Sequence, residues 1–199
     1  MKIYDISQEL LSSVVYDGDP APAVKRIRSM DEGELYNLTT LSMCVHNGTH
    51  IDAPRHFIND GNDVSAIPLA KFVGAAYVTH LDGDIDTATA TRILNNAMEI
   101  NPDSARRILF AGNGVLTLDA ARHLAAVGVL LVGTESQSVG PANAPMAVHL
   151  ALLSHNVVLL EGLRFSAVPE GVYFLSAQPL NIAGSDGSPT RAILIDGII

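Results

Sequence analysis

Short apolar runs recur along the chain and predict β-strands. They occupy residues 107–111, 127–132, 157–160, 172–175 and 192–195, and four of the five are bounded by Gly, Pro or Asn. The runs are continuous rather than alternating, which is typical of strands covered on both faces. The pattern therefore favours a layered structure in which helices pack on a sheet.

Apolar side chains at helical spacing predict helices between these strands. The first two helices run through residues 90–98 and 118–125, and Thr117 is placed to be the N-cap of the second. Strands that alternate with helices predict an α/β fold and argue against a β-sandwich or a jelly roll. No linker or repeat divides the chain, so we expect one domain over residues 1–199. The order of the strands does not follow from the pattern.

A third helix is expected over residues 145–154, with Pro145 in its first position. Helical spacing places four side chains on its inward face: Met146, His149, Leu150 and Leu153.

Four side chains that commonly bind metals lie close together in the sequence: His46, His50, Asp52 and His56. All four positions are even, and alternate side chains of an extended chain point to the same face. Gly48 and Pro54 oppose a helix, and irregular backbone around Gly48 would bring the side chains closer than a straight strand does. A strand here would bury the apolar residues at odd positions: Leu41, Met43, Val45, Ile51 and Phe57.

Imidazole and carboxylate groups are the usual ligands of Zn(II), Mn(II) and Fe(II). A catalytic metal site commonly takes three protein ligands and leaves a position for water, and His46, His50 and Asp52 supply that set. His56 is then free to act as a proton shuttle. The alternative is that these are ordinary surface or core histidines, but four such groups crowd into one short stretch of a chain that has 7 His. Cys44 is expected to be a small buried residue rather than a ligand.

His149 and Glu161 are further candidates. For His149 the simpler interpretation is a core histidine bonded to a backbone carbonyl. Glu161 directly follows the apolar run 157–160, and a carboxylate at a buried strand end is costly unless it is paired or ligated. The alternative for Glu161 is a solvent-facing loop. With Asp52 as a bridge, both residues would form a second metal site, since paired metals lie about 3.5–4 Å apart.

The composition restricts the function classes. The chain has 199 residues, a formal charge of −9 and no basic cluster, which argues against partners such as nucleic acid or an anionic membrane surface. Residues 1–11 lack the pattern of a signal peptide, and no stretch is long and apolar enough to span a bilayer. We therefore expect a soluble, cytoplasmic protein that binds a small molecule.

The histidine-aspartate stretch resembles the signature of the cyclase-like metal-dependent hydrolases, a family that includes the bacterial kynurenine formamidases (arylformamidases) and the isatin hydrolases. That signature reads His-x3-His-x-Asp-x-Pro-x-His with Gly-Thr before the second His, and residues 46–56 match it in full. The spacing of His149 and Glu161 is similar to the second metal pair of the formamidases. Residues 5–7, 18–20 and 184–192 look like the beginning and the ending of the family, so the likeness covers nearly the whole chain.

The resemblance implies a swivelling β/β/α domain and a homo-oligomer, either a dimer or a tetramer. It implies that His46, His50 and Asp52 hold one zinc ion, that Asp52, His149 and Glu161 hold a second, and that His56 is the general acid/base. The isatin hydrolase branch is similar but uses one manganese ion, so the number and identity of the metals stay open.

The chain also differs from the formamidases. Residues 16–19 read Tyr-Asp-Gly-Asp where the formamidases tend to have an aromatic-Pro-Gly-Asp run, and residues 135–138 read Glu-Ser-Gln-Ser where the family often has an Asp-Thr-Pro-Ser-like run. Trp is absent and aromatic residues make up 5% of the chain, so no aryl-binding pocket is evident. These differences bear on the substrate more than on hydrolysis.

The resemblance implies an arylformamidase-like enzyme of tryptophan catabolism that converts N-formylkynurenine to kynurenine and formate with a metal-activated water. One alternative is an isatin-hydrolase-like or lactone hydrolase with another cyclic substrate. Another is a non-haem iron oxygenase with His50, Asp52 and His149 as facial triad, which would leave the other candidates unused. A third, of a different class, is a catalytically silent protein that binds metal or ligand.

Overall fold

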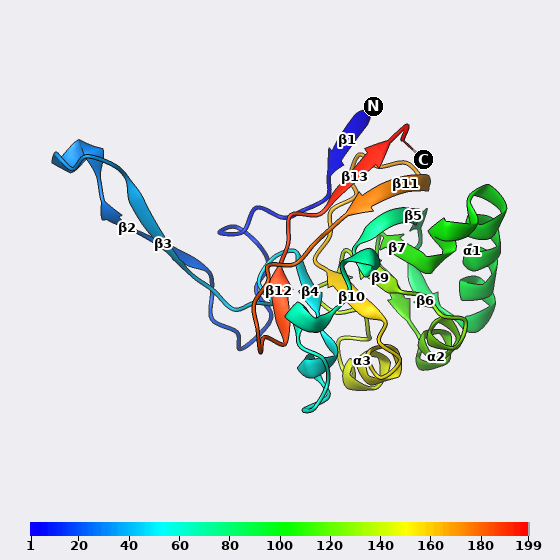
Figure 1. The fold of residues 1–199 in the computed structure, drawn as a ribbon. Coiled ribbons are helices and arrows are strands. Elements are labelled where there is room, and N and C mark those ends of the chain that lie inside the picture. Colours follow the sequence, from blue (N-terminus) through cyan, green and yellow to red (C-terminus); the bar gives the residue numbers. More distant parts are fainter. Residues whose placement is uncertain (199) are drawn as a thin grey trace.

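A nine-stranded mixed β-sheet forms the centre of the computed structural model, which describes residues 1–198 (Figure 1). From one edge to the other the strands are β1 (Lys2–Asp5), β13 (Ile193–Asp196), β11 (Gly171–Ser176), β5 (Val73–His80), β7 (Arg107–Ala111), β9 (Leu131–Thr134), β10 (Val158–Glu161), β4 (His50–Asp52) and β12 (Gly187–Pro189).

The four central strands, β5, β7, β9 and β10, are parallel, and the strands outside them pair antiparallel. Parallel neighbours need crossover connections, and here these contain α1 (Thr87–Ile100), α2 (Leu118–Ala126) and α3 (Met146–Leu153). The three helices lie on one side of the sheet (Figure 1). The prediction of an α/β fold with helices between the strands is therefore confirmed.

Both faces of the sheet are buried, and β7 shows how the pleat divides them. Ile108 and Phe110 belong to the core under the helices, whereas Leu109 and Ala111 point into a second core on the opposite face. Within residues 1–198 that second core contains no α-helix; it includes Ile51 of β4 and Leu194 of β13, together with residues from loops and from the 3-10 helix Val64–Ala66. The sheet thus curls over its own second core, which matches the β/β/α layering that the family resemblance implied.

The N-caps of the first two helices follow from the sequence. The side chain of Asp86 accepts a hydrogen bond from the backbone N–H of Thr89 before α1, and Thr117 accepts one from Ala120 before α2. Each cap satisfies an N–H group that the first helical turn leaves free. The predicted N-cap role of Thr117 is confirmed.

Two predicted elements need correction. The apolar run 127–132 is not one strand: Val127 caps the end of α2, Gly128 turns the chain with φ of +83°, and β9 begins only at Leu131. Glycine tolerates this left-handed conformation, so it ends the helix despite the apolar residues on both sides.

In α3, the prediction that Pro145 is the first helical residue is wrong, because Pro145 is the N-cap. The predicted inward face is also partly wrong. Met146 and Leu150 are exposed, and the buried face consists of Val148, His149, Leu152 and Leu153. The segment is apolar on almost every side, so periodicity alone could not select the face.

Shorter elements complete the structure. A parallel pair, β6 (Gly83–Ile85) and β8 (Gly114–Leu116), lies outside the main sheet. Five 3-10 helices connect other elements: Met30–Glu32, Pro54–His56, Val64–Ala66, Leu69–Lys71 and Pro102–Arg106. None of the helices in residues 1–198 combines the length and apolarity needed to cross a lipid bilayer.

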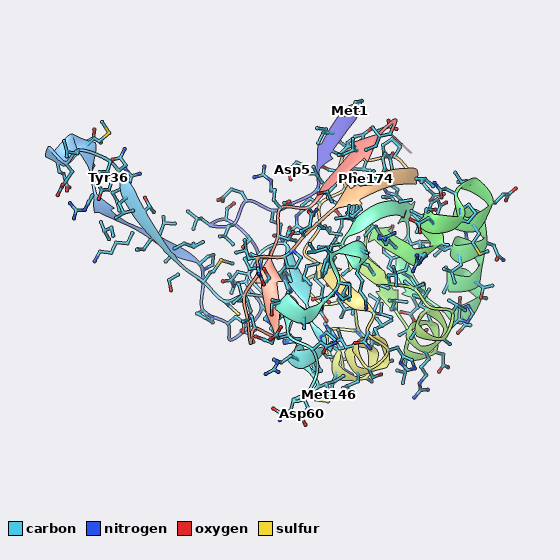
Figure 2. The ribbon with its side chains drawn as sticks, in the orientation of Figure 1. Met1, Asp5, Tyr36, Asp60, Met146 and Phe174 are labelled. Carbon is cyan, nitrogen blue, oxygen red and sulfur yellow. The ribbon has the colours of Figure 1, made fainter. Side chains whose placement is uncertain are left out.

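A long antiparallel hairpin projects from the body (Figure 1). Its strands are β2 (Ala23–Arg28) and β3 (Leu38–Ser42), and every residue of both strands is exposed. Figure 2 labels Tyr36 near its outer end, far from the other labelled residues. We call residues 23–42 the arm; the apolar runs of the sequence did not predict it.

Candidate metal centre

The site is built around β4, which is much shorter than the pattern of alternating positions suggested. The predicted strand through residues 41–57 is wrong for residues 43–49 and after Asp52: Leu41 and Ser42 are the end of β3, a turn precedes β4, and the 3-10 helix Pro54–His56 follows it. Leu41 is exposed, whereas Ile51 is fully buried. The backbone bends at Gly48, where φ is +66°, and this irregular segment brings His46 toward β4, as the sequence predicted.

A first group of donors consists of His46, His50 and Asp52. Nδ1 of His46 lies 2.9 Å from Oδ1 of Asp52, and Nε2 of His50 lies 3.4 Å from the same oxygen. Each of the three residues places one possible metal-ligand atom within 4.8 Å of those of the other two. The structure therefore brings together the three residues that sequence spacing selected as a metal set.

A second group consists of Asp52, His149 and Glu161, all buried and with donor atoms within the same 4.8 Å limit. Nε2 of His149 lies 3.3 Å from Oε1 of Glu161 and 3.7 Å from Oδ2 of Asp52. Asp52 thus presents one carboxylate oxygen to each group. Its position between them is the geometry that a bridging carboxylate requires.

Strand pairing explains why Glu161 meets this site. β10 pairs antiparallel with β4, and Glu161 is directly opposite His50. Oε1 of Glu161 also accepts a hydrogen bond of 2.7 Å from the N–H of Val139, which orients the carboxylate. The interpretation of Glu161 as a solvent-facing loop residue is therefore excluded, since it is the last residue of a buried strand.

Two imidazoles are held by backbone carbonyls. Nδ1 of His50 lies 3.0 Å from the carbonyl of Gly48, and Nδ1 of His149 lies 2.8 Å from that of Pro145. A carbonyl only accepts, so each Nδ1 must carry the proton, and each Nε2 is directed at the carboxylates. Metal-binding histidines are commonly oriented in this way. His149 therefore makes the predicted bond to a backbone carbonyl through Nδ1 and still offers Nε2 as a candidate metal ligand.

Burial and charge act against each other in this cluster. Burial lowers the pKa of His50, but hydrogen bonding to Asp52 and Glu161 and their charges raise it to about 10. The pKa values of His46 and His149 are also raised, despite burial, by Asp52 and Glu161 respectively. Burial raises the pKa of Asp52, but His46 and His50 hold it well below its usual range.

These side chains fit a divalent cation. Asp52 and Glu161 are almost fully buried, and in residues 1–198 their ion-pair partners are histidines rather than Lys or Arg. Buried carboxylates need positive charge, which comes either from protons on the imidazoles or from a metal ion. Histidine nitrogens together with carboxylate oxygens are a donor set suited to zinc and manganese.

His56 lies beside the donors, on the 3-10 helix that follows β4. Its ring centroid is 4.1 Å from that of His46, and Nδ1 is 3.3 Å from Oδ2 of Asp186. His56 is partly open to solvent, as a group that exchanges protons must be. It also forms a third possible donor group with His46 and Asp186.

Asp186 is a site residue that the pattern of motifs did not single out. Its Oδ2 lies 2.8 Å from Nε2 of His46, while the other ring nitrogen of His46 faces Asp52. Burial raises the pKa of Asp186, but His46 outweighs this effect and lowers it. In the sequence, the available signal for Asp186 was its place in the family-like ending, residues 184–192.

The next residue, Gly187, begins β12 against β4. A Cβ atom there would lie 2.6 Å from Cε1 of His46. Only glycine lets β12 approach the imidazole so closely, so the chain ending helps to shape the site.

A cavity of about 280 Å³ opens onto the cluster. Besides the histidines and carboxylates, its lining includes Tyr16, Asp19, Phe57, Gln137, Ser138 and Pro145. Both polar atoms of the Gln137 amide and Oγ of Ser138 are buried without a hydrogen-bond partner in the described chain. Gln137 and Ser138, which belong to the run where the chain differs from the formamidases, thus line the cavity.

A larger groove, of about 740 Å³, is lined by segments within residues 5–10 and 178–191 together with Thr49. It contains no histidine or cysteine, so the smaller cavity is the candidate site on chemical grounds. Cys44 is half-buried rather than buried as predicted, and its Sγ lies 3.8 Å from Asp19.

Comparison with known proteins decides the family. Residues 4–141 match the model of the Cyclase family, described as "Putative cyclase". The chain belongs to this family. Among curated family relatives, the kynurenine formamidase of Erythrobacter litoralis (strain HTCC2594) is 35% identical over 204 residues, which covers 97% of this chain and 93% of the relative. The kynurenine formamidase of Maricaulis maris (strain MCS10) is 35% identical and covers 97% of each chain.

Solved structures of the family share the fold. A protein described as a potential metal-dependent hydrolase with cyclase activity has a TM-score of 0.81 and 29% identity, covering 100% of this chain and 99% of its own. Isatin hydrolase A from Labrenzia aggregata, bound to benzyl benzoate, has a TM-score of 0.80 over 98% of this chain and 94% of its own, at 21% identity. The latter identity supports the likeness of fold alone.

Proposed function

We propose that this chain is a metal-dependent hydrolase that cleaves the C–N bond of a small amide, and that its substrate is N-formylkynurenine. The observation that carries the proposal is Asp52, fully buried between two donor groups at the base of a cavity. The relatives named kynurenine formamidase, which align over nearly the whole chain, support the choice of substrate.

His46, His50 and Asp52 would hold one ion, and Asp52, His149 and Glu161 would hold a second. Zinc is the ion that we propose, with manganese as the alternative. When bound, such an ion lowers the pKa of a coordinated water and polarises a carbonyl. The carbonyl-held imidazoles of His50 and His149 keep their Nε2 atoms directed inward.

His56 is the proposed general acid/base. Asp186 holds its Nδ1, so Nε2 is the atom that would exchange protons with the reacting groups. Nε2 would take a proton from the attacking water and return it to the leaving nitrogen, producing formate and a free amine. Such proton transfer contributes about 10²- to 10⁴-fold to a rate.

Substrate recognition would use side chains with unused polar atoms. The amide of Gln137 and the hydroxyl of Ser138 lie buried in the cavity lining without partners, and burying them unpaired is costly. A polar substituent of the substrate would satisfy them. Tyr16 and Phe57 line the cavity and would supply aromatic surface for a ring.

We also propose that the protein works in the cytoplasm as a homo-oligomer, in tryptophan catabolism. The chain carries a formal charge of −9 without a basic cluster, which suits a small-molecule enzyme rather than a protein bound to nucleic acid or membranes.

Metal analysis combined with a release assay tests the proposal. The protein, loaded with zinc or manganese, is offered N-formylkynurenine, isatin and simple lactones. We expect formate release from N-formylkynurenine. Opening of isatin or a lactone instead would replace the substrate and keep the reaction class. Bound metal without turnover of any compound would favour the catalytically silent alternative.

A further inference from the structure

Asp19 is a carboxylate of the cavity lining that neither proposed metal site uses. The cavity is lined by the carboxylates of Asp19, Asp52 and Glu161, and its lining contains no Lys or Arg. Asp52 and Glu161 belong to the donor groups described above, whereas none of the donor groups found in residues 1–198 includes Asp19. The charge of Asp19 is therefore available to another group that enters the cavity.

Within residues 1–198, Asp19 has no cationic partner of its own. Its carboxylate takes part in none of the ion pairs of this part of the chain. Its side chain accepts a hydrogen bond from the thiol of Cys44, whose Sγ lies 3.8 Å from Oδ2. A thiol is a weak donor, so this contact satisfies little of the carboxylate. Asp19 is also half-buried, and a charge that is taken out of water is stabilised by a partner of the opposite sign.

A tight turn places Asp19 together with Tyr16 at the cavity. The N–H of Asp19 donates a 3.0 Å hydrogen bond to the carbonyl of Tyr16, so these two residues begin and end a four-residue turn. Gly18, the third residue, has φ of +91°, a conformation that glycine adopts without strain. Tyr16 lines the same cavity, and an aromatic ring attracts an ammonium group as a carboxylate does. The turn thus presents two side chains that both favour a cation.

We propose that Asp19 is a specificity residue that binds an ammonium group of the substrate, so that the cavity selects small amides whose tail carries an amine. This inference rests on the proposed function, since it names a feature of the substrate that the same cavity takes. N-formylkynurenine has such a group because it is an α-amino acid, whereas isatin and simple lactones have none. A substrate whose only charge is a carboxylate would meet Asp19 in a lining without Lys or Arg.

Changing the enzyme and the substrate together tests the proposal. Zinc-loaded wild type, Asp19→Asn and the control Asp17→Asn are assayed by formate release with two compounds. These are N-formylkynurenine and the counterpart in which hydrogen replaces the α-amino group. Asparagine keeps an oxygen for the thiol of Cys44, and Asp17 is exposed and lies outside the cavity lining. Both variants remove one negative charge, so the overall charge of the protein changes equally in the two.

The expected result is a loss of substrate preference in Asp19→Asn alone. We expect wild type and Asp17→Asn to prefer N-formylkynurenine in kcat/KM by about 10- to 100-fold, which corresponds to one hydrogen bond with a charged group. Asp19→Asn should lose most of this preference through a higher KM for N-formylkynurenine, because the contact with the tail is the same before and during the reaction.

The other outcomes would overturn the proposal. A merely structural role of Asp19 would lower kcat for both compounds alike. An unchanged preference in Asp19→Asn, or a wild type without any preference, would show that Asp19 does not bind the ammonium group. The same loss in Asp17→Asn would show an effect of overall charge rather than of a contact in the cavity.

Calorimetry separates a failure of this proposal from a failure of the proposed function. Kynurenine, which keeps the α-ammonium group, and its counterpart without that group are titrated into the same three zinc-loaded proteins. We expect Asp19→Asn to bind kynurenine about 10-fold or more weakly than wild type and control do, with a much smaller change for the other compound. If neither formyl compound is hydrolysed but kynurenine binds in this pattern, the proposed reaction is wrong and the ammonium site stands. If hydrolysis is absent and the three proteins bind kynurenine equally or not at all, the ammonium site is overturned as well.

Discussion

Asp52 is the residue on which the candidate site depends most. It is fully buried, and its two oxygens face different groups of donors. A buried carboxylate is tolerated only with positive charge close by, and here three histidines or a cation must supply it. The same requirement makes the surrounding residues sensitive to small chemical changes.

Replacing His56 by alanine should reduce catalysis without reducing metal binding. His56→Ala is expected to keep the bound metal and to lower kcat by about 10²- to 10⁴-fold, because a proton-transfer group is lost and no proposed ligand is changed. Metal content and formate release are measured on the same sample. The matched control is His155→Ala, an exposed histidine. Full turnover in His56→Ala would remove His56 from the mechanism.

Glu161 tests the number of metals. We expect Glu161→Gln to lower the bound metal from two ions per chain to one. Glutamine keeps an oxygen for the N–H of Val139, so the substitution changes the charge with little change in local structure. Elemental analysis gives the stoichiometry. Finding one ion in both wild type and variant would point to a single-ion site.

The raised pKa of His50 predicts how the metal-free protein responds to pH. The pKa of this group is about 10 in the folded chain against an ordinary value of 6.5. The stabilisation it provides is complete below pH 6.5 and is lost as pH rises toward 10. We expect the Tm of metal-free protein to fall across this window.

Zinc-loaded protein is the control for this pH dependence, because a ligating Nε2 has no proton to lose. Its Tm should change less over the same window. Parallel decreases in both forms would mean that protonation of this cluster does not dominate stability at alkaline pH.

Among the elements, β7 shows how one buried charge fixes neighbouring segments. Arg107 begins the strand and is buried, and its guanidinium donates to the carbonyls of Lys71 and Ala75 and to Asp103. It thereby joins the 3-10 helix before β5 to the start of β7. These bonds hold together the first two parallel strands.

Replacing this residue should destabilise the fold without touching the site. Arg107→Met leaves buried carbonyls without donors, which costs about 1–3 kcal/mol for each unsatisfied group. The neighbouring Arg106 is exposed and pairs with Asp103 at 3.5 Å, so Arg106→Met should change stability by about 0.5 kcal/mol or less. Urea unfolding measures both. Equal effects would show that the buried bonds contribute little.

The elements that could be predicted from sequence are those whose apolar residues recur at a clear spacing or whose first turn has a recognisable N-cap residue. The helices α1 and α2 and the strand β7 follow from apolar spacing and from Thr117. The strand β5 was missed because Gly74, Ala75 and Ala76 carry little of the β-branched signal on which strand prediction depends. The arm was missed because its apolar residues alternate irregularly among charges, and its regularity comes only from pairing.

At the site, sequence spacing identified every donor that the fold brings together except Asp186. His46, His50 and Asp52 stand close together in the chain, so their proximity could be anticipated. Asp186 reaches the same place because β12 pairs with β4, and no local pattern reveals such a pairing. The roles of these residues in binding and catalysis stay predictions.

For the whole molecule, the distribution of charge predicts how salt affects the proposed homo-oligomer. The arm is neutral overall but contains the basic strand β2, and the rest of the chain carries the charge of −9. Between about 0.1 M and 1 M salt the screening length falls from about 10 Å to 3 Å, so attraction between β2 and an acidic body should weaken. If β2 of one copy faces the acidic body of another, the dissociation constant of the homo-oligomer should rise across this range. Sedimentation at several sodium chloride concentrations measures it.

The variant Lys25→Gln/Arg26→Gln is the control for the salt effect. Removing both charges should weaken the homo-oligomer at low salt and flatten the dependence of its dissociation constant on salt. A dissociation constant that is the same in all conditions would show that the charges of the arm do not contribute to assembly.

The distance along the chain between Asp52 and Glu161 has a consequence for biosynthesis. Translation adds about 5–20 residues per second, so His46, His50 and Asp52 leave the ribosome roughly 5–20 s before the strand that places Glu161 opposite His50. Throughout that interval the nascent polypeptide carries the first three proposed ligands without Glu161. Until β10 has been synthesised and has paired with β4, a metal ion bound by these three residues can still exchange with other metal ions in the cell.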